Sequence, residues 1–199
     1  MNTVKVGDIL ENEVLKIFKQ ELESGKLGIL ADHAKVFQKK GYYSKDREKD
    51  IIVDISIELW PPGSSNYSLL FVIECKNLGK PVPVDDIEEF KAKLDQIGGK
   101  NTKGIVVARN SFQSGAQKYA KNQGIGLARA MPKNQVSWLM HMVTSNSLKS
   151  ENDRILEVQE ALTVDSYEAK NRDLFAFCNE LTFESWRELI EYAITPITQ

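Results

Sequence analysis

The stretch from residue 51 to residue 76 constrains the fold more than any other part of this 199-residue chain. From Ile51 to Leu59 every odd position is apolar and β-branched residues dominate, which is typical of a β-strand. Turn-forming residues then fill Trp60 to Asn66 and end that strand. The run from Leu69 to Cys75 is apolar on both faces, which predicts a second strand in the middle of a sheet.

Helices and short strands are expected to alternate around this pair. Apolar residues recur at three- and four-residue spacing in the expected helices, and continuous apolar runs mark the further strands. We predict helices over Asp8–Glu23, Asp85–Ile97 and Ser114–Gln123, and strands over Gly104–Ala108 and Ile125–Ala128. This order indicates an α/β fold, a mixed β-sheet flanked by helices.

The pattern weakens after residue 131, so we expect a core at residues 1–131 and a mostly helical C-terminal extension at residues 132–199. Amphipathic helices are predicted at Ile155–Leu162 and Phe183–Ile194, and the apolar run Val136–Val143 fits a strand or a helix. The sequence leaves open whether this extension is a helical addition, a dimerisation element or part of a second domain.

Composition excludes some classes of protein. With 42% hydrophobic and 27% charged residues the chain matches ordinary globular proteins, and its lack of a long apolar run predicts no membrane span. No secretory signal is recognisable, and Cys75 and Cys178 are the only cysteines, so we expect a cytoplasmic location. The net charge of −2 disfavours a broad DNA-binding surface. The basic stretch 35–49 fits either a solvated loop or a local phosphate-binding patch.

The tripeptide Glu74-Cys75-Lys76 is set apart by its position at the end of an apolar strand. The same spacing recurs at 89–91 and 168–170, where exposed helix is expected and surface charge is the interpretation. In a strand, residues two apart share a face, so Glu74 and Lys76 point one way and Cys75 points into packing. Cys75 has no histidine at a recognisable partner position and is interpreted as a small buried hydrophobe.

The register of the hairpin adds a second carboxylate. If the chain turns within Trp60–Tyr67, Asp54 lies opposite Glu74 with Cβ atoms roughly 5 Å apart. Such carboxylates repel each other unless one is protonated or a cation lies between them, and Mg²⁺ prefers oxygen ligands of this kind. The alternative is a register shifted by a residue or two, with Asp54 at a frayed strand end.

This arrangement resembles the PD-(D/E)xK nuclease superfamily, and most closely its Mrr-type restriction endonucleases, over about Val4 to Arg129. The segment Gly7-Asp8-Ile9-Leu10-Glu11 is similar to the family's early glutamate pattern, and the closing helix and strand are matched by residues 112–116 and 124–127. Val53 replaces the nominal proline, and Arg129 stands where an acidic residue is common. The second departure leaves the active-site residues untouched.

The resemblance implies a Mg²⁺-dependent endonuclease, of restriction or defence type, that hydrolyses DNA, with Mn²⁺ as the expected substitute ion. It implies that Asp54, Glu74 and the backbone carbonyl of Cys75 bind the metal. Lys76, partly desolvated, is expected to have a lowered pKa and to orient or deprotonate the attacking water. Glu11 is expected to contact a metal-bound water or Lys76, the alternative being a surface glutamate. A homodimer is consistent with cutting both strands, and no organic cofactor is expected.

Two other classes of function remain open. One is a catalytically inactive binding module with the same fold, which the slight acidic balance favours. The other is a subunit of a larger defence or repair complex, assembled through the helix that carries Trp186. A zinc site is disfavoured because His33 and His141 lie far apart without cysteine neighbours. Gly124-Ile-Gly126 lacks the lysine of a phosphate-binding loop.

Overall fold

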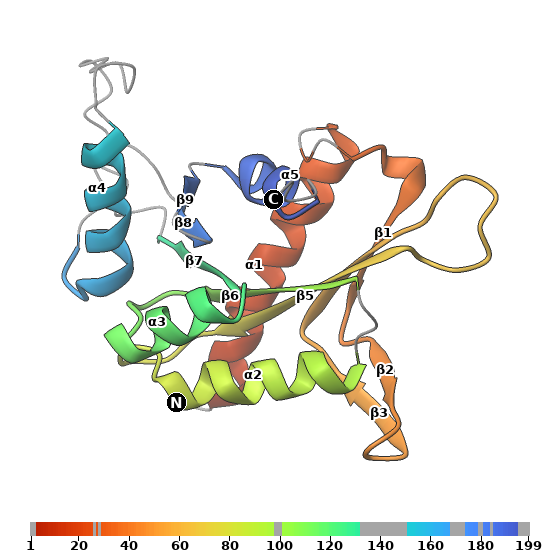
Figure 1. Ribbon diagram of the computed structural model, residues 1–199, viewed down its shortest axis with the longest axis horizontal. Coiled ribbons are helices and arrows are strands. Elements are labelled where there is room, and N and C mark those ends of the chain that lie inside the picture. The colour runs from red at the N-terminus through yellow and green to blue at the C-terminus, as the bar shows by residue number, and fades with distance from the viewer. Residues whose placement is uncertain are drawn as a thin grey trace.

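A computed structural model of the chain describes residues 3–25, 27, 29–97, 101–131, 151–167, 174–178, 181–183 and 185–194. Figure 1 shows one main sheet with helices around it and the β2–β3 hairpin projecting from it. In chain order the helices and strands are α1 (Thr3–Glu23), a short 3-10 helix (Ala31–His33), β1 (Ala34–Gln38), β2 (Gly41–Ser44), β3 (Lys49–Ile52), β4 (Ile55–Leu59), β5 (Leu69–Lys76), α2 (Val84–Ile97), β6 (Thr102–Ala108), α3 (Ser114–Asn122), β7 (Gly126–Ala130), α4 (Glu151–Thr163), β8 (Leu174–Cys178), β9 (Leu181–Phe183) and α5 (Trp186–Ile194).

The sheet confirms the predicted mixed α/β class. Its strand order is β1-β4-β5-β6-β7-β8-β9, and β5, β6 and β7 run parallel while the other neighbours are antiparallel. The predicted hairpin register is also confirmed, because Ile55 lies opposite Ile73 and Leu59 opposite Leu69. One step beyond the ladder, this register brings Asp54 to the level of Glu74.

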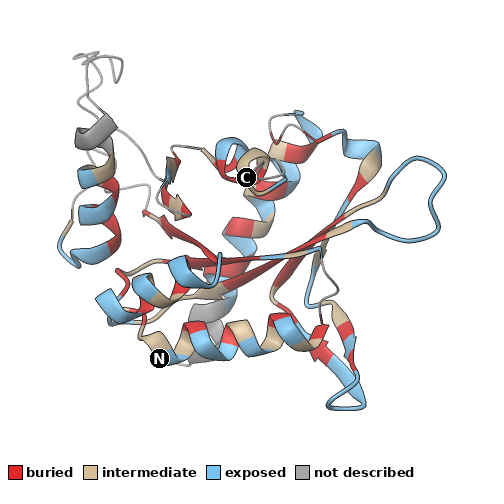
Figure 2. Ribbon diagram, viewed as in Figure 1, coloured by how far each residue is buried: buried red, intermediate tan, exposed pale blue. Residues whose placement is uncertain are grey.

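Separate apolar layers cover the two faces of the sheet. Phe71 and Ile73 of β5 pack with α1 and α5, whereas Leu70 and Val72 pack with α2, α3 and α4. In Figure 2 the central strands are accordingly buried, and the loop between β4 and β5 is exposed. The alternation continues past Ile73. It directs Cys75 toward the α1 layer, where it packs, and Glu74 and Lys76 toward α2, as predicted.

The region before Asp54 differs from the sequence expectation. Residues 35–49 were predicted as a polar stretch, yet they contain β1 and β2 and the first residue of β3. The single strand expected over 51–59 is broken at Val53-Asp54, because β3 pairs with β2 in a separate hairpin while β4 enters the main sheet. The strands of the hairpin are hard to recognise in the sequence because they are short and only Tyr42 and Ile51 among their residues are apolar and buried.

The C-terminal part contains the two predicted helices, α4 and α5, and two strands that the sequence did not indicate. β8 pairs with β7, so this part continues the main sheet. Trp186 is 6% exposed and packs against Phe18 of α1 with ring centroids 4.8 Å apart. The idea that Trp186 mediates assembly is therefore wrong, because its ring is used inside its own chain. Val136–Val143 and His141 lie outside the described residues.

Helix α2 approaches β6 closely at Gly104, which gives a stability prediction. A Cβ atom at Gly104 would meet the side chain of Leu94 and lie 2.9 Å from Cε1 of Phe90, both of them buried. Gly104→Ala is expected to lower the free energy of unfolding by about 1–3 kcal/mol through overpacking. Chemical denaturation measures this change. The matched control is Gly79→Ala, since nothing lies within 4 Å of that Cβ; equal effects of the two variants would contradict the prediction.

Across the described part of the chain, no helix combines the length and apolar character that crossing a membrane requires.

Candidate functional site

The candidate site lies at the end of the sheet where β4 begins and where β5 and β6 finish. Asp54 immediately precedes β4, Glu74 and Lys76 end β5, and Arg109 follows β6. Helix α1 passes over this end of the sheet and contributes Glu11. The strand directions explain the grouping, because the carboxyl ends of parallel β5 and β6 meet the amino end of antiparallel β4.

Asp54 is held from two sides. Its Oδ2 accepts a hydrogen bond of 2.9 Å from the backbone N–H of Cys75, so the carboxylate extends the β4–β5 ladder by one position. Its Oδ1 lies 2.7 Å from Nζ of Lys39. The orientation of this carboxylate is therefore fixed relative to the end of β5.

Glu11 joins Asp54 through the same lysine. Its Oε1 lies 2.6 Å from Nζ of Lys39, and the residue is only 6% exposed. Its other oxygen, Oε2, is buried and has no hydrogen-bond partner among the described residues. The expected contact between Glu11 and Lys76 is not the one formed, because Lys39 reaches Glu11 instead. The idea that Glu11 is a surface glutamate is wrong as well.

Glu74 and Lys76 form a second pair on the α2 side. Nζ of Lys76 lies 3.3 Å from Oε1 of Glu74 and 3.2 Å from Oδ1 of Asp86. Lys93 of α2 adds a contact of 3.0 Å to the same Glu74 oxygen. Glu74 is 6% exposed, so these amines compensate a buried charge. Sequence reasoning missed Asp86 and Lys93, whose only signal is their helical spacing on the face of α2 toward β5.

The two pairs meet at Cys75. Its pKa is raised well above the usual value, first by burial and then by the negative charges of Asp54, Glu11 and Glu74. All three carboxylates therefore act on one thiol, which stays protonated and does not serve as a nucleophile. Cys75 therefore connects the two groups of carboxylates, because Asp54 binds its backbone on the α1 side and its chain neighbour Glu74 faces α2.

The predicted lowering of the Lys76 pKa is wrong. Burial of its amine does lower the pKa, but the charges of Glu74 and Asp86 and their hydrogen bonds outweigh burial, and the net shift is upward. Lys39 shows the same balance, with a pKa raised by Asp54 and Glu11 against the effect of burial. Both lysines are therefore charged at neutral pH.

The basic stretch 35–49 is a solvated loop only at residues 45–49, which are exposed, and phosphate binding by those residues stays a prediction, whereas three lysines earlier in the stretch have partners in their own chain. Lys35 lies over the Trp60 ring at 3.9 Å, and Lys40 lies 2.6 Å from the fully buried Glu58. Lys39 binds the candidate site as described above. Lys39 and Lys40 thus balance carboxylates of their own chain, and Lys35 makes a cation–π contact with a ring of its own chain.

A divalent cation is compatible with this donor set. Among the described residues no three His, Cys, Asp or Glu side chains are grouped closely enough to enclose a metal ion by themselves. Mg²⁺, however, commonly takes only one or two carboxylates and completes its shell with water and phosphate oxygens. The partnerless oxygen of Glu11, and the Glu11 and Asp54 carboxylates that the half-exposed Lys39 balances, fit such an open site.

Comparison with known proteins identifies the family of the chain. A family model of the Mrr catalytic domain, described as a restriction endonuclease, matches residues 32–131, which include Asp54, Glu74 and Lys76. A crystal structure of a protein of unknown function is similar at 20% sequence identity and a TM-score of 0.38; the similarity covers 54% of this chain and 55% of that one. The chain thus spans about half the length of that protein. No curated protein matches the chain.

Proposed function

The chain belongs to the restriction endonuclease family that the Mrr catalytic domain represents, and we propose that it is a metal-dependent endonuclease that cleaves DNA. The observation that carries this proposal is the contact between the Asp54 side chain and the end of β5. The Asp54 carboxylate is hydrogen-bonded to the backbone of Cys75, between Glu74 and Lys76. Within this family, the four residues Asp54, Glu74, Lys76 and Glu11 form a coherent hydrolytic set.

Each group has a distinct part in the proposed chemistry. Asp54, Glu74 and the Cys75 carbonyl would hold Mg²⁺ or Mn²⁺, and such an ion supplies an acidified water and neutralises charge on the scissile phosphate. Lys76 would donate hydrogen bonds to the attacking water or to a phosphate oxygen, because the charges of Glu74 and Asp86 raise the pKa of its amine. Glu11 orients water from the α1 side.

We further propose that residues 1–131 form the catalytic unit and that residues 132–199 support it. The observation behind this proposal is that Arg129 of β7 donates hydrogen bonds to the carbonyls of Ala161 and Val164 near the end of α4, which joins the two parts. Cleavage of both strands of a duplex usually takes two such centres, so a homodimer is part of the proposal.

One observation favours a second candidate, a catalytically inactive DNA-binding module. Lysines already compensate the carboxylates of the site, and the described residues contain no closed metal cluster. Such a module would bind DNA without cleaving it.

Incubation of the purified protein with supercoiled, linear and branched DNA distinguishes the two candidates. The proposed function predicts nicking or linearisation of at least one substrate with Mg²⁺ or Mn²⁺, and none with a chelator. A parallel gel-shift series in Ca²⁺ measures binding without cleavage. Binding to DNA without cleavage under any metal condition would contradict the nuclease and support the inactive module.

A further inference from the structure

Lys39 occupies the space between two carboxylates of the candidate site. Its Nζ lies 2.6 Å from Oε1 of Glu11 and 2.7 Å from Oδ1 of Asp54, which come from α1 and from the start of β4. No other cation among the described residues bridges these two groups. A single ammonium group therefore stands at the point where the two negative charges converge.

The backbone at Lys39 is shaped to deliver this side chain. Lys39 has a φ of +51°, a left-handed conformation that residues other than glycine seldom adopt and that surrounding structure must enforce. Its N–H donates a 2.9 Å hydrogen bond to the carbonyl of Asp54, so main chain and side chain are both tied to the same residue. The next residue, Lys40, turns to the other side and binds Glu58.

The Lys39 side chain is also able to leave. It is 48% exposed, whereas the Glu11 side chain is 7% exposed. Glu11 retains a buried oxygen without a partner among the described residues, so the ammonium group of Lys39 does not satisfy all the acceptors of Glu11. A divalent ion with its water shell offers more charge and more donors to the same two carboxylates than a lysine does.

We propose that Lys39 is a built-in competitor of the metal ion, holding Glu11 and Asp54 together without metal and giving way to the ion when it binds. This inference rests on the proposed metal-dependent function and adds a residue that sets metal affinity. Once displaced, the ammonium group remains tethered at the mouth of the site, where a phosphate of the substrate is the partner that it fits.

The size of the effect follows from competition. The apparent dissociation constant for the metal ion equals the intrinsic constant divided by the fraction of molecules in which the lysine is away from the carboxylates. If Lys39 is seated in about nine molecules of ten, its removal tightens metal binding roughly tenfold. A purely structural ion pair predicts the opposite, because its loss would let Glu11 and Asp54 separate and weaken the site.

Titration calorimetry with Mn²⁺, combined with thermal unfolding without metal, tests the inference in the full chain. Lys39→Met keeps an unbranched stem and the same backbone requirement. Its melting temperature without metal should fall, and its affinity for Mn²⁺ should rise roughly tenfold. Lys39→Arg retains a competing cation and should stay near wild type. Lys45→Met, at the exposed hairpin tip, controls for the lost charge and should change neither quantity.

The outcomes separate this inference from the proposed function. Tighter Mn²⁺ binding by Lys39→Met alone supports it, even if that variant is less stable. Equal or weaker binding by Lys39→Met, while wild type binds Mn²⁺, overturns it and leaves the nuclease proposal standing. Failure of wild type itself to bind Mn²⁺ overturns both.

Discussion

Lys76→Met is expected to lower the single-turnover rate of DNA nicking by on the order of 10²–10³-fold, because one preorganised donor to the reacting phosphate or water is lost. The native amine lies 3.3 Å from Glu74 and 3.2 Å from Asp86 and is charged, so methionine removes both the charge and the donor at nearly constant volume. The free energy of unfolding should fall by about 1–3 kcal/mol, because the buried Glu74 loses one of its two amines but keeps Lys93 at 3.0 Å. Nicking of a supercoiled plasmid with Mg²⁺ measures the rate.

The chain offers a matched control for this variant. Lys91 also stands two residues after a glutamate, but it lies on α2 and forms an i,i+4 pair with the exposed Asp95. Lys91→Met makes the same chemical change and should leave nicking close to the wild-type rate. Equal activity of Lys76→Met and wild type would remove Lys76 from the proposed mechanism.

Arg129→Met is expected to destabilise the protein by about 3 kcal/mol, because it removes a buried guanidinium group and leaves the buried carbonyl of Ala161 and three partly buried carbonyls without this donor. Arg129 is 3% exposed and donates to the carbonyls of Ala161 at 2.5 Å, Val164 at 2.7 Å, Asp165 at 3.2 Å and Arg109 at 3.1 Å. A cation at the carboxyl end of α4 also meets the negative end of that helix. Urea denaturation monitored by circular dichroism measures the loss.

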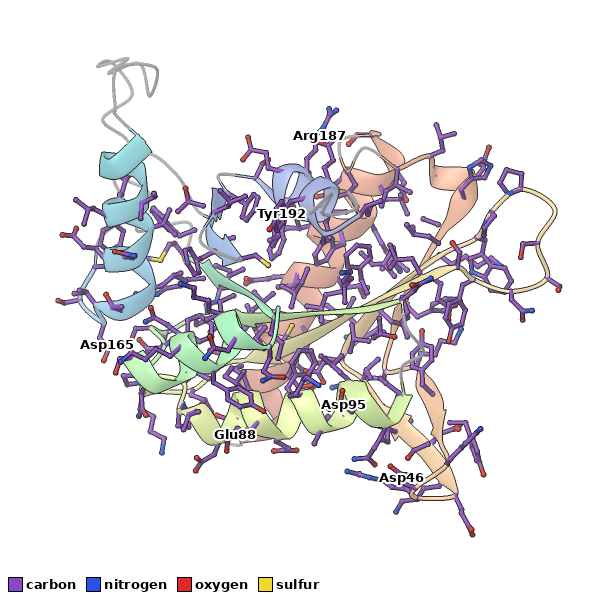
Figure 3. All side chains as sticks on the ribbon, viewed as in Figure 1. Asp46, Glu88, Asp95, Asp165, Arg187 and Tyr192 are labelled. Carbon is purple, nitrogen blue, oxygen red and sulfur yellow. The ribbon has the colours of Figure 1, made fainter. Side chains whose placement is uncertain are left out.

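Arg187→Met serves as the control for Arg129→Met. Arg187 projects outward from α5 in Figure 3 and pairs only at the surface, with Glu191, so the expected loss is within about 0.5 kcal/mol. Arg129→Lys should lie between the two, since an ammonium group satisfies some of the carbonyls but not with the planar fork of arginine. Losses of similar size for Arg129→Met and Arg187→Met would contradict this account of Arg129.

The central sheet could be predicted from sequence because its signals are local. Apolar alternation and a single turn set the β4–β5 register, and the spacing of apolar residues set α2. The same reasoning missed β1 and the β2–β3 hairpin, because charged residues in and between these strands have partners far along the chain. Lys40, in the connection between β1 and β2, is an example, since it pairs with the buried Glu58 across 18 positions.

The candidate site was predictable in part for the same reason. Glu74 and Lys76 lie on β5 and Asp54 immediately precedes β4, so the register that the sequence sets brings Asp54 to the end of β5, where it accepts a hydrogen bond from Cys75. Lys39 and Lys93 reach the site from a strand connection and from α2, and nothing in the sequence separates them from surface lysines. Burial lowers the pKa of Lys76, and the charges of Glu74 and of Asp86, ten positions away, raise it further than burial lowers it, a balance that could not be foreseen without coordinates.

The most direct test of the central claim is the initial rate of plasmid nicking as Mg²⁺ or Mn²⁺ is titrated into wild type, Asp54→Asn and Asp95→Asn. Asp54 is held at the proposed metal position, whereas Asp95 is an exposed residue of α2, so the two variants differ only in where the same charge is lost. The account predicts saturable, metal-dependent nicking by wild type and Asp95→Asn and none by Asp54→Asn. Nicking by Asp54→Asn at the wild-type rate, or wild-type nicking that persists in a chelator, would contradict it.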